Sequence, residues 1–109
     1  MAARAGTEGI SMATTDESTK NLAIVTTLGN DRSGIVAAVS QTLAEAGVNI
    51  MNISQTIMDG IFTMTMQVSL RDATKEFTRI QEELNRVAKE MNLQIVMQRE
   101  EVFRYMYRL

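Results

Sequence analysis

The segment from Gly29 to Gly34 has the residue types of a ligand-binding loop. Its two glycines let backbone approach a bound molecule closely, and a helical apolar pattern begins directly after it, at Ile35. Unpaired N–H groups at the start of that helix attract a carboxylate, and an Asp31 oxygen can accept a hydrogen bond from an ammonium group. These features suit a zwitterion such as an amino acid. Capping of the helix by Asp31 or Ser33 explains the same residues, and spacing alone favours capping.

Asn49 and Asn52 form a second candidate for binding. They lie at the start of a second predicted strand, beside the end of the first predicted helix. In a dimer paired through this strand, their amides would face the loop of the partner and could donate to a ligand. Turn and bulge chemistry explains the two asparagines equally well.

Several chemistries are excluded by composition, because the 109 residues contain no Cys and no His. Zinc sites, cysteine nucleophiles and Ser-His-Asp triads are therefore absent, and we predict neither a metal nor a cofactor. The net charge of −2 lacks the basic excess of most nucleic-acid-binding domains. No apolar run is long enough to cross a membrane. The lack of Cys fits a reducing compartment, and we expect a cytoplasmic protein.

The chain from residue 21 onward predicts four strands and three helices. Alternation indicates strands over 22–28, 48–58, 62–70 and 93–98, and helical spacing indicates helices over 35–46, 77–91 and 100–109. Asp59-Gly60 predicts a two-residue hairpin, imperfect alternation around Met51 and Asn52 predicts a bulge, and Gly47 and Asn92 are expected to end the helices before them. Thr74 is a candidate cap for the second helix.

This order predicts an α+β fold, the ferredoxin-like βαββαβ sandwich. We expect an antiparallel sheet in the order 4-1-3-2 with two helices on one face, followed by a short C-terminal helix. Residues 21–109 would form this single domain. Residues 1–20 are poor in large apolar side chains, so we expect a disordered tail, part of which is a tag or an upstream extension if Met12 is the natural start.

The second strand would be an edge of this sheet, and it has no charge between Val48 and Met58. Exposed edges are normally paired, covered or charged. We expect dimerisation through this edge and its neighbouring helices; the alternative is a monomer whose terminal helix covers the edge. The sheet face away from the two helices would be mostly polar, with Thr63, Thr65, Gln67 and either Thr26 or Thr27 on it.

Two stretches resemble the ACT domain, whose opening is a strand, a loop with Asp-Arg and a glycine before the helix, and Gly-X-Asn-Ile at the next strand. They are Gly29-Asn30-Asp31-Arg32-Ser33-Gly34-Ile35-Val36-Ala37 and Gly47-Val48-Asn49-Ile50. The resemblance covers nearly all of residues 21–109, and departs at Ser33, where many members have Pro. Ile53 to Thr56 and Glu101 to Tyr107 look most like the small stand-alone bacterial and archaeal ACT proteins of uncharacterised function, which are similar to the ACT repeats of the glycine cleavage system transcriptional repressor.

The resemblance implies side-by-side homodimers with a small effector, commonly an amino acid, at the interface. Carried over by position, the binding residues are Asn30, Asp31, Ser33, Gly34, Ile35 and Val36 in the loop, and Asn49 and Ile50 at the strand.

The resulting prediction is a dimeric, non-enzymatic module that binds a small molecule and regulates a separate enzyme or transcription factor. One alternative is a protein-interaction scaffold with a vestigial ligand pocket. A small hydrolase that uses Arg32 and Asn49 is a further alternative, which the lack of an obvious base or nucleophile beside the loop disfavours.

Overall fold

The computed structural model describes residues 21–106, with side chains up to Arg104. The expected tail over residues 1–20 and the last three residues of the predicted terminal helix lie outside the described residues. Within this range the element order is β-α-β-β-α-β-α, as predicted. The elements are β1 (Leu22–Asn30), α2 (Ile35–Glu45), β2 (Asn49–Met58), β3 (Ile61–Ser69), α3 (Phe77–Met91), β4 (Leu93–Arg99) and α4 (Glu100–Met106).

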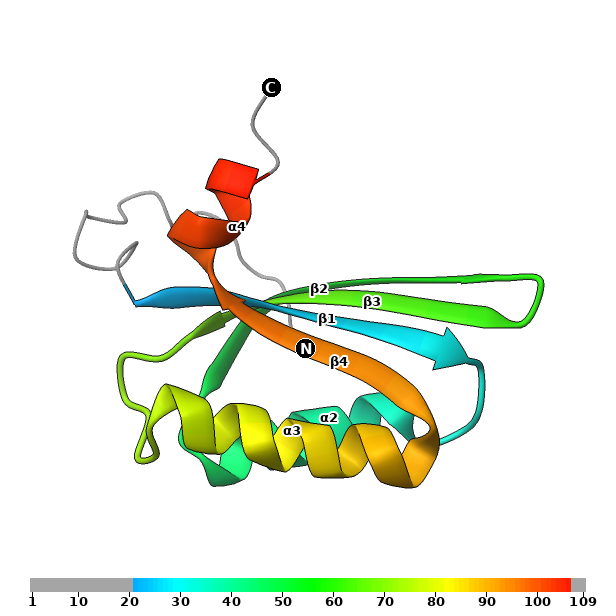
Figure 1. Cartoon of the computed structure of the whole chain (residues 1–109), viewed down its shortest axis with the longest axis horizontal. Coiled ribbons are helices and arrows are strands. Elements are labelled where there is room, and N and C mark those ends of the chain that lie inside the picture. The colour runs from blue at the N-terminus through cyan, green and yellow to red at the C-terminus, as the bar shows by residue number, and fades with distance from the viewer. Residues whose placement is uncertain (1–20, 107–109) are drawn as a thin grey trace.

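The four strands form one antiparallel sheet in the order β2-β3-β1-β4, which confirms the predicted ferredoxin-like topology. Helices α2 and α3 lie side by side under one face of this sheet (Figure 1). β2 and β4 are its edges, and the predicted bulge occurs in β2 between Ile50 and Asn52.

The core lies between the sheet and the two helices. Every second residue of the central strands points into it, and the helices contribute side chains spaced three to four residues apart. The core is therefore a single layer of strand and helix side chains. Its members include Val25, Met64, Met66, Val68, Ile35, Val39, Leu43, Ile80 and Leu84, each at most 2% exposed. The methionines at 64, 66 and 97 fill this core, as expected for methionines on apolar faces. The same expectation is wrong for Met51 and Met58 of β2, which are 44% and 68% exposed.

The turns follow the predicted chemistry, but the helix starts do not. Asp59 and Gly60 have φ of 53° and 78°, as a two-residue hairpin turn of this type needs. Thr74 does not cap α3, whose N-cap is Glu76 without a side-chain hydrogen bond. Thr74 instead donates its backbone N–H to the Ala46 carbonyl, at 2.8 Å, which ties the loop to the end of α2.

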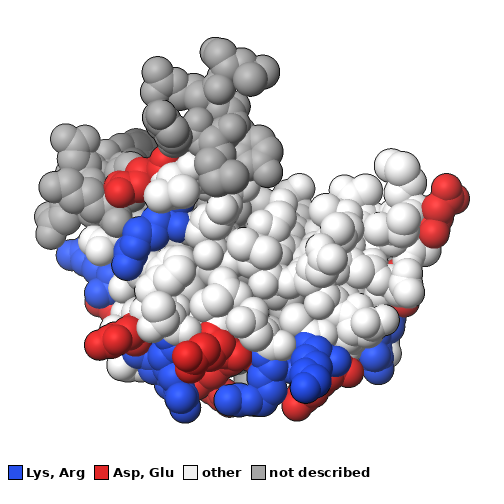
Figure 2. Space-filling model, viewed as in Figure 1, with Lys and Arg blue, Asp and Glu red and all other residues white. Residues whose placement is uncertain are grey.

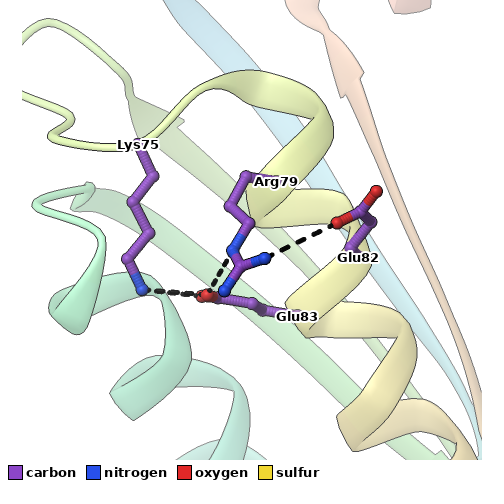
Figure 3. Close-up of polar contacts among 4 residues, drawn as sticks. All are labelled: Lys75, Arg79, Glu82 and Glu83. Atoms are coloured by element: carbon purple, nitrogen blue, oxygen red, sulfur yellow. Dashed lines mark hydrogen bonds and ion pairs between the residues drawn. The ribbon is translucent and has the colours of Figure 1, made fainter.

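A cluster of ion pairs joins Lys75, in the loop before α3, to the first turns of that helix (Figure 3). Lys75 Nζ lies 2.9 Å from a Glu83 carboxylate oxygen, and Arg79 Nε lies 3.1 Å from the same oxygen. Arg79 also reaches the more exposed Glu82, at 4.0 Å. The hydrogen bond from Lys75 is the largest influence on Glu83 and lowers the pKa of its carboxyl, burial opposes that change, and Arg79 adds to the lowering.

The other face of the sheet, which we call the open face, is covered at one end by α4. Figure 1 shows α4 on the side of the sheet opposite α2 and α3. It packs on β1 and β4, where Leu22 and Ile24 are buried. Thr26, Thr63, Thr65 and Gln67 share this face by strand register, whereas Thr27 points into the core and is 0% exposed.

Candidate functional site

The loop between β1 and α2 is fixed to the hairpin at one end of the sheet. Asn30, the last residue of β1, pairs with Ile61, and Asp31 donates its backbone N–H to the Gly60 carbonyl at 2.8 Å. The side chains of Asn30, Asp31 and Ser33 are exposed. The loop is therefore held by its backbone, and its polar side chains face solvent.

The N-terminus of α2 has no side-chain cap. Gly34 is the N-cap residue with φ of 90°, in the left-handed region, and neither Asp31 nor Ser33 caps the helix. This corrects the capping interpretation, because a glycine turn starts the helix here. The N–H groups of the first turn have no intrahelical acceptor, and no acidic residue lies in that turn. The exposed backbone at Gly34 thus presents donors and the positive end of the helix dipole.

Ile35 and Val36 anchor this helix start. Ile35 is 2% exposed and belongs to the core, and Val36 is half-buried against the same cluster. Their side chains point largely into the protein and are therefore not available to a polar ligand.

Asn49 and Ile50 lie at the opposite end of the sheet from the loop. Asn49 pairs with Ser69 and Ile50 with Val68, whereas Met58, at the other end of β2, pairs with Ile61 beside the loop. Nine residue steps along a strand span about 30 Å. One chain therefore does not bring the two groups of predicted site residues together. The same separation holds for Arg32 and Asn49, the pair considered for hydrolysis.

The β2 edge is open along its length. Every residue from Met51 to Met58 is exposed, none is charged, and Ile53 and Ile57 are 44% and 55% exposed. Helix α4 packs on β1 and β4, so the expectation that the terminal helix covers the β2 edge is wrong for the described residues. An uncharged edge of this length is a template for pairing with another strand.

Charges gather on the helical side of the molecule. Figure 2 shows Lys, Arg, Asp and Glu along the helical layer and an uncharged band over the sheet. By register, the strand positions on the open face carry no charged residue, and Leu28, Ile61 and Val96 are large apolar side chains exposed there. The face predicted to be mostly polar is thus mixed. Among the described residues no cluster of acidic side chains suits a metal ion, and no helix is both long and apolar enough to cross a membrane.

Two polar features escaped sequence reasoning. Thr27 Oγ1 is buried with no hydrogen-bond partner among the described residues. Gln67 accepts a hydrogen bond from Asn52 and donates one to Glu100, which is 3% exposed. The alternation of β3 places Gln67 on the open face, but only the fold shows that α4 returns to that face and brings Glu100 to it.

Comparison with known proteins places the chain in one family. The ACT domain family model matches residues 21–98. A UPF0237 protein of Methanocaldococcus jannaschii is 43% identical over 86 residues, which cover 79% of this chain and 96% of that protein. An ACT domain protein from Streptococcus pneumoniae is 43% identical with a TM-score of 0.66, covering 75% of this chain and 92% of that one. A structure assigned as a glycine cleavage system transcriptional repressor is 26% identical with a TM-score of 0.62, covering 71% of this chain and 44% of the other.

Proposed function

Because the chain belongs to the ACT domain family, we propose that it is a regulatory module which binds a small molecule, most simply an amino acid, between two copies of itself. Ligand binding would favour one packing of the dimer through its differential affinity, and so control a separate protein. The proposal includes a cytoplasmic location, with which the absence of Cys agrees, and no catalytic role.

This proposal rests on the separation between the loop residues, at one end of the sheet, and Asn49 and Ile50, at the other end. If two β2 edges pair antiparallel, the Asn49 end of one strand lies beside the Met58 end of the other. That end is joined to the loop by the pairing of Met58 with Ile61 and of Ile61 with Asn30. Each dimer would then have two equivalent sites, each with Asn30, Asp31 and Gly34 from one copy and Asn49 and Ile50 from the other. The uncharged, exposed β2 edge supports this pairing.

The chemistry of the loop supports a ligand with a carboxylate and an amine. The uncapped first turn of α2 at Gly34 offers N–H donors to a carboxylate. The exposed Asp31 carboxylate and Asn49 amide can bind an ammonium group or a side chain.

The similarity to a protein assigned as a transcriptional repressor supports a regulatory role. The proposal places the regulated activity on another chain, either an enzyme or a transcription factor.

A scaffold that binds another protein is the second candidate. The exposed Leu28, Ile61 and Val96 on the open face favour it, because clustered apolar side chains mark protein contacts. In this case no small molecule would change the stability of the protein.

A thermal-shift panel with the standard amino acids at millimolar concentration tests the proposal. A ligand at 100 times its Kd stabilises its site by about 2.7 kcal/mol, and each kcal/mol raises the Tm of a domain this small by ~4–8 °C. We expect a selective hit that Asp31→Ala abolishes. Glu82→Ala is the matched control, since it removes an exposed carboxylate from α3. A flat panel would refute amino-acid binding and favour the scaffold.

A further inference from the structure

A line of polar side chains crosses the open face from the β2 edge to α4. Asn52 Nδ2 donates to Gln67 Oε1 at 2.6 Å, and Gln67 Nε2 donates to Glu100 Oε1 at 2.8 Å. Arg104 Nε donates to Glu100 Oε2 at 2.7 Å. We call these four residues the relay. It joins an exposed edge strand, a central strand and the terminal helix.

The direction of the relay is fixed by its chemistry. The Glu100 carboxylate can only accept, so Gln67 must turn its amide nitrogen toward α4 and its oxygen toward β2. That oxygen then needs a donor, which Asn52 supplies. A hydrogen-bond acceptor at position 52 would face another acceptor, and the orientation of Gln67 would lose its support.

The bulge in β2 is what aims Asn52 at Gln67. Ile50 pairs with Val68, which points into the core, and without an irregularity Asn52 would also point to the core face. The extra residue, Met51, shifts the alternation of side chains between the two faces by one residue, so that Asn52 pairs with Gln67 on the open face. The bulge therefore lets the Asn52 amide connect the edge strand, through Gln67, to Glu100 of α4.

Helix α4 depends on its contacts with the sheet. It has only seven residues, too few for a stable isolated helix. It buries Glu100, and it packs on β1 at the end of the open face where Leu22 and Ile24 are 7% and 8% exposed. Further along the same face of β1, Leu28 is 45% exposed. Release of α4 would extend this exposed apolar strip over Leu22 and Ile24.

We propose that α4 is a releasable cap on the open face, coupled through the relay to the β2 edge. A contact at that edge which takes up the Asn52 amide, whether a second copy or a ligand held between copies, weakens the hold of Gln67 on Glu100 and loosens α4. The signalling role rests on the proposed function; the coupling between Asn52 and α4 does not.

Asn52→Asp tests the coupling in the full chain without any ligand. The change conserves size but places an acceptor opposite Gln67 Oε1. Ser54→Asp is the matched control, because it adds the same charge to the same strand and face, two residues further on, opposite Thr65. Hydrogen exchange measured by mass spectrometry reports the opening of residues 100–106 and of α3 separately.

We expect Asn52→Asp to raise exchange in residues 100–106 about tenfold while exchange in α3 and in the Ser54→Asp control stays at the wild-type rate. Gln67→Leu removes the middle of the relay and should give the same local increase. Unchanged exchange in α4, an equal rise in α3, or an equal effect of Ser54→Asp would overturn the proposal. A negative exchange result would not change the outcome of the thermal-shift panel. A panel without a hit would likewise leave the coupling between Asn52 and α4 intact, so the two proposals can be refuted separately.

Discussion

Thr27 is the residue whose burial is hardest to explain by packing alone. Its neighbours across the sheet are Met64 and Ile95, it is 0% exposed, and its hydroxyl has no partner within the described residues. A buried hydroxyl without a hydrogen bond costs free energy, because its bonds to water are lost on folding.

Thr27→Val should therefore stabilise the protein. The methyl group matches the hydroxyl in size and removes the unmet hydrogen bond, so we expect the free energy of unfolding to rise by about 1 kcal/mol. Urea denaturation at pH 7 measures this, with Thr26→Val on the open face as the control. A destabilised Thr27→Val variant would contradict this account, because it would show that the Thr27 hydroxyl does form a hydrogen bond in the folded protein.

The sequence could not decide which threonine of β1 faces the core. Leu22, Ile24 and Leu28 alternate with Ala23 and Val25, so both faces of the strand look apolar and the parity is ambiguous. The physical reason is that α4 returns over Leu22 and Ile24 on the open face. A strand covered from both sides loses the alternation that fixes its orientation.

At the scale of elements, the charged cluster around Glu83 links the α3 helix to the loop before it. The folded-state pKa of Glu83 lies below its ordinary value of 4.5, chiefly because Lys75 donates hydrogen bonds to the carboxylate. The stabilisation is therefore complete above the unfolded pKa and is lost as pH falls through the folded pKa.

Glu83→Gln should flatten the acid dependence of stability. We expect the free energy of unfolding of the wild type to fall from pH 5 toward pH 3 more steeply than that of this variant, measured by urea denaturation at several pH values. Glu82→Gln is the control, because Glu82 is exposed and only 4.0 Å from Arg79. Parallel curves for wild type and Glu83→Gln would contradict this account of the cluster.

The elements themselves were largely predictable, because the periodicity of each segment agrees with its packing. Asp59, Gly60, Gly47 and Asn92 all adopt the positive φ that their positions predict. The helix starts were not predictable in the same way. Gly34 begins α2 through backbone conformation, so the side chains of Asp31 and Ser33 are left for other uses.

At the scale of the whole molecule, the β2 edge is expected to be the dimer interface. Ile53→Lys places a charge at the centre of this exposed strand, and charge on an edge opposes pairing. We expect a dimer for the wild type and a monomer for this variant in sedimentation equilibrium. Val96→Lys on the open face is the control, since Val96 is 48% exposed and lies away from β2. If the Ile53→Lys and Val96→Lys variants form dimers to the same extent, the dimer interface lies elsewhere.

The candidate site itself was only partly predictable. Spacing identified the loop and the asparagine-bearing strand as separate candidates, and the described structure keeps them at opposite ends of one chain. No feature of sequence spacing reports a distance between two copies, so their assembly across a dimer stays a prediction.

Mixing Asp31→Ala with Asn49→Ala protein tests the central claim most directly. Each variant alone would lack one half of both sites and should not bind the amino acid that the thermal-shift panel selects. If the site spans two copies, a mixed dimer contains one intact site, and random exchange of subunits restores about a quarter of the wild-type binding capacity in calorimetric titration. No recovery on mixing, with both variants confirmed as dimers, would contradict a site shared between copies.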